Sequence, residues 1–110
     1  MSGRPPYELR YDPRLKIERP SLNVDYEALS KTEREEFEVI CQKVCSRISL
    51  QIRSFEKAYL ERFEALERTE DDEAFYVLLD EMNEISSCIS DLNVLFLHIE
   101  GRFLASREHA

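Results

Sequence analysis

The chain has little glycine, no long apolar run and no excess of basic residues, and each absence excludes a class of protein. Its 110 residues include only two glycines, and 35% of the residues are charged. This composition favours long helices with solvated faces over a loop-rich or many-stranded fold. No apolar run approaches the ~18–20 residues that span a bilayer, and residues 1–9 lack the apolar core of a signal peptide. We therefore expect one small domain with a cytoplasmic location and no membrane contact.

Charge and motif content exclude further classes. A net charge of −8 argues against direct binding of nucleic acid, because phosphate contacts require a basic face. The sequence contains no glycine-rich phosphate loop and no Glu-x-x-His pair of the kind that holds metals in helical bundles. It also offers no Ser/His/Asp set that could be positioned for catalysis. We predict a non-enzymatic protein with no catalytic residue and no cofactor.

The three cysteines are an odd number in a chain without an export signal, so we expect free thiols rather than disulfides. Cys41 and Cys45 share a helix face, and a helical hairpin folded near residue 69 would bring His98 to the level of Cys41. These side chains are suitable zinc ligands, but a structural zinc site needs four ligands and Cys88 falls further along the axis. We predict buried apolar cysteines and no metal site.

The best-specified pattern is a seam of apolar residues at alternating spacings of three and four, which is typical of a coiled-coil-like helix. It consists of Phe75, Leu78, Met82, Ile85, Ile89, Leu92, Phe96, Ile99 and Phe103. An earlier apolar stripe from Phe37 to Leu66 has the helical period, and Thr32 with Glu35 resembles a capping box before it. Thr69 with Asp72 resembles a second capping signal. We predict helices over about 31–68 and 71–106 that form an antiparallel hairpin.

A second stripe on the later helix lies about half a turn away from this seam. It contains Asn83 and the predicted oligomer-interface residues Ser87, Ser90, Val94, Leu97, Gly101 and Leu104. Its small residues would allow another helix to approach closely, whereas the alternative is a solvated face with stray leucines. Two antiparallel helices leave much apolar surface wet, so we predict a bundle of four helices formed by oligomerisation.

The first twenty residues differ from the rest. All four prolines lie there, and residues 4–19 carry five basic and three acidic side chains. Apolar residues occupy alternate positions, which is typical of an extended segment with one buried face, and the predicted partner-binding residues are Tyr7, Leu9, Tyr11, Leu15 and Ile17. The segment could lie over its own helices, contact a second chain, remain disordered, or form a hairpin at Asp12-Pro13, which lacks the glycine that tight hairpins prefer.

Together these patterns predict an all-α fold, with an extended arm over residues 1–20 and a helical hairpin domain over residues 21–110. Two functions compete. The first is an assembly or adaptor module that oligomerises through the hairpin and engages a protein partner or a twin subunit through the arm. The second is an acidic inhibitor that imitates nucleic acid, based on Glu61, Glu64, Glu67, Glu70, Asp71, Asp72 and Glu73 near the hairpin tip. The sequence leaves open the partner's identity and whether the oligomer contains one kind of chain or two.

Overall fold

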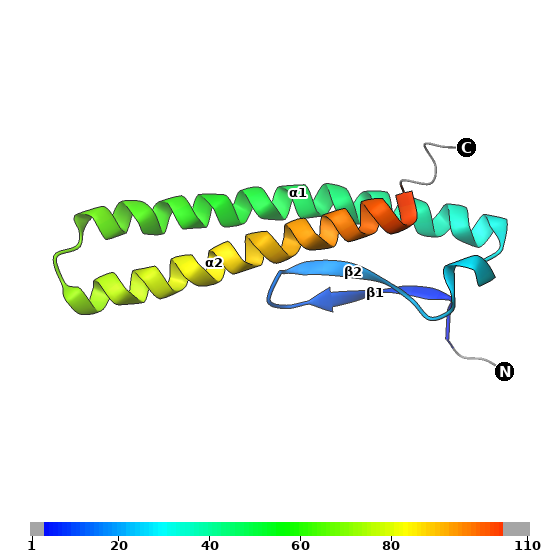
Figure 1. Ribbon diagram of the computed structural model, residues 1–110, viewed down its shortest axis with the longest axis horizontal. Coiled ribbons are helices and arrows are strands. Elements are labelled where there is room, and N and C mark those ends of the chain that lie inside the picture. The colour runs from blue at the N-terminus through cyan, green and yellow to red at the C-terminus, as the bar shows by residue number, and fades with distance from the viewer. Residues whose placement is uncertain (1–3, 105–110) are drawn as a thin grey trace.

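The computed structural model describes residues 4–104 and consists of two long helices beside a small β-hairpin (Figure 1). Strands β1 (Tyr7–Asp12) and β2 (Ile17–Leu22) come first, followed by the single 3₁₀ turn η1 (Tyr26–Ala28). Helix α1 (Lys31–Arg68) and helix α2 (Asp72–Ile99) then run antiparallel, and the π-helical turn η2 (Glu100–Leu104) follows α2 directly. The molecule measures 60 × 35 × 15 Å, which reflects the length of the helical pair.

The predicted helical hairpin is present, although its capping residues differ from those expected. Helix α1 starts at the Ser30 N-cap, where the Ser30 side chain accepts from the Glu33 N–H and Glu33 reaches back to the Ser30 N–H. The capping box thus lies two residues before the predicted Thr32–Glu35 pair. Helix α2 is capped by Asp71, whose side chain accepts from the Ala74 N–H at 2.9 Å, rather than by Thr69. Both caps place a carboxylate where the helix dipole favours it.

The end of the second helix also departs from the prediction. Regular α-geometry stops at Ile99, and residues 100–104 form a π-helical turn with a wider backbone repeat. Each residue of this turn is therefore rotated less about the helix axis than in an α-helix. Phe103 and Leu104 are both buried. The predicted extension to residue 106 lies outside the described residues. Within residues 4–104, no helix combines the length and apolarity needed to cross a membrane.

The prediction of a purely helical fold is wrong at the N-terminus, where β1 and β2 form a two-stranded antiparallel sheet. The reversal occurs in a four-residue loop after Asp12, which is the local hairpin that the sequence offered as one of several alternatives. Strand β2 continues to Leu22 and so crosses the predicted boundary between residues 20 and 21. The segment is therefore a hairpin that packs on the helices, not a separate extended arm.

The hydrophobic core lies where the β-hairpin covers one end of the helical pair. Tyr7, Tyr26, Phe37 and Phe103 form connected aromatic contacts, with ring centroids of Phe37 and Phe103 5.0 Å apart. Aliphatic side chains of the β-hairpin and of both helices extend this cluster, namely Leu15, Ile17, Val44, Ile48, Leu92, Leu95 and Ile99. Between Ile48 and Met82 no residue is fully buried, so the far half of the hairpin is a two-helix rod without a third layer. The molecule thus has a covered end and an uncovered end.

Candidate interaction surfaces

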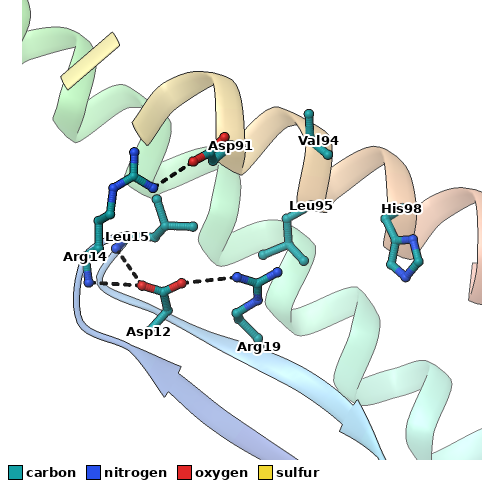
Figure 2. A pocket seen from close by; sticks show the side chains of 8 residues that line it. All are labelled: Asp12, Arg14, Leu15, Arg19, Asp91, Val94, Leu95 and His98. Atoms are coloured by element: carbon teal, nitrogen blue, oxygen red, sulfur yellow. Dashed lines mark hydrogen bonds and ion pairs between the residues drawn. The ribbon is translucent and has the colours of Figure 1, made fainter. Parts of the chain in front are cut away.

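The loop between the strands is held by the carboxylate of Asp12. One oxygen accepts from the backbone N–H groups of Arg14 and Leu15, each at 3.0 Å, and the other pairs with Arg19 at 3.1 Å (Figure 2). The Leu15 N–H is the main reason that the pKa of Asp12 is lowered, and Arg19 adds to the effect. Lys16 closes the loop in the left-handed region, with φ of 56°, and its N–H donates to the Asp12 carbonyl. An aspartate and a left-handed lysine thus replace the usual glycine turn.

The loop is fastened to α2 by Arg14. Its guanidinium donates to Asp91 at 2.7 Å, to Glu84 at 2.9 Å and to the Ser87 hydroxyl at 2.7 Å. These acceptors lie on one face of α2, and the bonds to Asp91 and Glu84 raise the pKa of Arg14. The Arg14 side chain remains partly exposed, so its ion pairs contribute little to the stability of the fold. Their role is to fix where the loop lies on α2. Sequence reasoning missed Arg14, although the spacing of Glu84, Ser87 and Asp91 indicates a row of acceptors.

A cleft of about 380 Å³ opens beside this contact, between the hairpin and α2 (Figure 2). It is lined by Asp12, Arg14, Leu15, Arg19, Asp91, Val94, Leu95 and His98. Its charged groups already pair with one another, Asp12 with Arg19 and Arg14 with Asp91. Within residues 4–104, no group of three histidine, cysteine or acidic side chains could hold a metal ion. The cleft thus runs along the contact between the hairpin and α2, and its charged side chains are paired with one another.

The three cysteines are free and buried. Burial raises the pKa of Cys41 to about 12 and that of Cys45 to about 11, because the thiolate is poorly solvated in the core. Burial also raises the pKa of Cys88, whose thiol lies 3.6 Å from a Glu84 oxygen. At neutral pH all three are protonated and pack as small apolar side chains, and His98 lies against Phe103.

The residues predicted to bind a partner through the arm fall into two groups. Leu15 and Ile17 are buried in the core, and Tyr7 packs on Phe37 while its hydroxyl donates to Glu36 at 2.7 Å. Leu9 and Tyr11 remain 37% and 61% exposed. The prediction of one continuous apolar face is wrong, because the loop reverses the chain and places the odd-numbered residues of β2 on the other face of the sheet from those of β1. Asp12 pairs with Ile17, so these two side chains lie on one face of the sheet, whereas Tyr11 lies on the other face.

The two faces of the hairpin look toward different helices. Asp12 and Arg19 border the cleft against α2, whereas Tyr11 and Glu18 border a second groove against α1. That groove is completed by Arg47, Leu50 and Gln51 of α1, and Arg47 pairs with Glu18 at 3.4 Å. The hairpin therefore stands with β2 nearest the helices and β1 outermost, as Figure 1 shows.

The predicted oligomer interface on α2 is largely exposed in the single chain. Val94 and Leu97 are 63% and 67% exposed, and Ser87, Ser90 and Gly101 are exposed as well. A Cβ atom built at Gly101 meets nothing within 4 Å, so the surface there is open. Leu104 differs from the other five, because the π-helical turn directs it into the chain's own core. Ser87 also bonds to Arg14, so the exposed apolar part of the stripe is Val94 and Leu97.

The uncovered end of the helical pair carries a further apolar surface. Tyr59, Leu60 and Phe63 of α1 and Phe75 of α2 are exposed. A shallow hollow of about 210 Å³ lies between the helices, lined by Glu56, Tyr59, Ser86 and Ile89. Two packed helices do not cover these side chains, which is why they stay wet in the single chain. Comparison of the sequence with family models and curated proteins, and of the structure with solved structures, found no significant match.

Proposed function

We propose that this protein is a non-enzymatic protein–protein interaction module that assembles through its helical hairpin. The observation that carries the proposal is the exposure of Val94 and Leu97 on the second stripe of α2. Large aliphatic side chains at helical spacing lose contact with water when another helix packs on them, and this loss is favourable. The exposed side chains at the uncovered end, Tyr59, Leu60, Phe63 and Phe75, support the same reading.

Neighbouring residues on α2 and on the η2 turn suit close helix packing. Ser90 and Gly101 flank Val94 and Leu97, and the open space at Gly101 would let another backbone approach. The partner surface is then a helix or helical pair with an apolar stripe, from a second copy or from another protein. The four-helix bundle expected from the sequence is one arrangement that satisfies this requirement.

Substitution of Leu97 tests the proposal. Leu97→Glu places a charge that would have to be buried only in the interface, so it should weaken association at least about tenfold while leaving helix content unchanged. Val39→Glu is the matched control, because Val39 is an exposed apolar helical residue of α1 that lies outside both the stripe and the uncovered end. Sedimentation equilibrium gives the association and far-ultraviolet circular dichroism gives the helix content. If both variants associate like the unmodified protein, the stripe is not an interface.

A second candidate function rests on the acidic cluster at the hairpin tip. Its seven side chains, Glu61, Glu64, Glu67, Glu70, Asp71, Asp72 and Glu73, are all exposed, while the nearby Arg62 is engaged by Glu61 and Glu81. Such a surface could occupy a basic site of a nucleic-acid-handling protein. Salt separates the two functions. Binding through the acidic cluster would weaken steeply as ionic strength rises, whereas an apolar helix interface would change little.

A further inference from the structure

The outer edge of β1 is an unpaired strand edge. The sheet consists of β1 and β2 alone within residues 4–104, and β2 lies between β1 and the helices (Figure 1). The Asn23 N–H donates to the Pro6 carbonyl at 2.8 Å, so Pro6 and Asn23 form a hydrogen-bonded pair. This pair sets the phase of the ladder, that is, which residues of β1 bond to β2 and which do not. Because bonded and non-bonded pairs alternate in antiparallel strands, residues 8, 10 and 12 bond to β2. The N–H and C=O groups of Tyr7, Leu9 and Tyr11 therefore point to the open edge.

This phase agrees with the position of Pro20. Pro20 has no N–H and lies opposite Leu9 in the register. Because Pro6 and Asn23 form a hydrogen-bonded pair, Leu9 and Pro20 form a non-bonded pair, so the missing N–H of Pro20 removes no hydrogen bond between the strands. The same phase leaves a full set of donors and acceptors on the open edge of β1 from Tyr7 to Tyr11.

The residues along this edge have a two-fold pattern. Tyr7-Glu8-Leu9-Arg10-Tyr11 places tyrosines at both ends, a leucine at the centre, and a carboxylate and a guanidinium at mirrored positions. We propose that β1 pairs antiparallel with β1 of a second copy of this chain, with Leu9 opposite Leu9 of the second copy. Tyr7 then lies opposite Tyr11 of the other chain. Glu8, which pairs with Arg10 of its own chain at 3.2 Å, also lies opposite Arg10 of the other chain, so the aromatic and the charged cross-strand pairs are favourable.

Only this register satisfies both charge and hydrogen bonding. A shift that centres the pairing on Glu8 or Arg10 places like charges directly opposite each other, which is destabilising. A shift that centres it on Tyr7 or Tyr11 sets Leu9 opposite Pro5 or Pro13, which have no N–H to donate. In the Leu9-centred register the two prolines face each other just beyond the ladder and end it. Tyr7, Leu9 and Tyr11 supply all of its backbone bonds.

The pairing closes on itself. It creates a four-stranded sheet in the order β2-β1-β1-β2, whose outer strands both face helices. A two-stranded hairpin is marginal alone, and a larger sheet with a partly apolar face is more stable. The exposed Leu9 and Tyr11 side chains share one face and gain cross-strand neighbours in the dimer. Since no open edge remains, the product is a symmetric dimer rather than a fibre.

This inference rests on the proposed assembly function and assigns one of its partners, a second copy of the chain. It concerns β1 rather than α2, so the two can fail separately. An association that Leu97→Glu abolishes and that substitutions in β1 leave unchanged would support the helix interface and overturn the edge pairing. The converse result would support the edge pairing alone.

Charge reversal at the edge is the central test. Glu8→Arg places two basic pairs opposite each other, and Arg10→Glu places two acidic pairs, so each variant alone should dimerise at least about tenfold more weakly. An equimolar mixture of the two variants should form heterodimers, because each basic residue then faces an acidic one. The double variant Glu8→Arg/Arg10→Glu should dimerise like the unmodified protein. Sedimentation equilibrium of the full chain measures all four.

Two controls and a cross-link keep the result interpretable. Glu35→Arg and Lys43→Glu make the same charge changes at exposed helical positions and should not alter dimerisation. Circular dichroism confirms that each variant is folded. Leu9→Cys should form a covalent dimer on oxidation, because directly bonded antiparallel residues have Cα atoms about 5.5 Å apart, within disulfide range. The exposed Val24→Cys should not. Failure of the mixture to associate, or of Leu9→Cys to cross-link, would overturn the proposal.

Discussion

At the scale of single residues, two side chains do what a glycine turn does in most hairpins. Asp12 supplies acceptors for two backbone N–H groups, and Lys16 takes the left-handed conformation that completes the loop. A left-handed conformation costs a lysine about 1–2 kcal/mol, so the loop requires support from elsewhere. That support comes from Arg14 outside and Leu15 inside, which hold the loop against α2 and the core.

The lowered pKa of Asp12 predicts an acid-dependent loss of stability. A group whose folded pKa lies below its ordinary value of 3.8 contributes stability above that value and loses it as pH falls through the folded pKa. Asp12→Asn keeps an acceptor for the N–H groups but does not titrate. The difference in unfolding free energy between the unmodified protein and Asp12→Asn should therefore be constant near neutrality and shrink below about pH 4. Chemical denaturation over this range measures it, and a pH-independent difference would contradict the assigned role.

At the scale of elements, the β-hairpin belongs to the fold rather than to a separable arm. Leu15 is 2% exposed and lies in the same cluster as Val44, Leu92 and Leu95. Leu15→Ala should lower the unfolding free energy by about 2–4 kcal/mol, because it removes buried methyl groups and leaves a cavity. Leu50→Ala is the matched control at a site that is 62% exposed, and it should change stability by less than about 0.5 kcal/mol. Equal effects in urea denaturation would show that the hairpin is not docked as described.

The elements differ in how far the sequence predicts them. The bounds of α1 agree with the predicted 31–68, because a long apolar period is locally determined, although the capping box lies at Ser30 and not at Thr32. The sequence does not single out the hairpin among the alternatives, because the reversal of the chain depends on Asp12 and Lys16 and not on a glycine. The Asp12-Pro13 pair was the available signal, since both residues are typical of turn starts. The burial of Leu104 followed from a π-helical turn that the regular helical period does not reveal.

At the scale of the site, periodicity identified exposed stripes but not their occupants. The periodicity predicts that Val94 and Leu97 lie away from the seam, and the structure places both at the surface. The open edge of β1 was out of reach of the sequence, because the phase of its hydrogen bonds depends on the pairing of Pro6 with Asn23. The symmetric residues from Tyr7 to Tyr11 gain meaning only when that edge is known to be unpaired.

At the scale of the whole molecule, the chain is a rod with a covered end, where the β-hairpin packs on the helices, and an uncovered end. The covered end holds the core, and the apolar surfaces left in water lie on α2, on the uncovered end and on the edge of β1. A chain with this distribution gains most by association, since its own elements are too few to cover every apolar face. Association is thus the property on which the proposed function depends.

The molar mass of the full chain in solution tests that property most directly. Light scattering across micromolar concentrations should give a mass that rises from 13.0 kDa for one chain toward twice that value. The rise should persist at high salt, because apolar side chains and backbone hydrogen bonds supply most of the proposed contacts. High salt should weaken only the added contribution of the Glu8–Arg10 pairs. A mass that remains at 13.0 kDa throughout this range would contradict self-assembly.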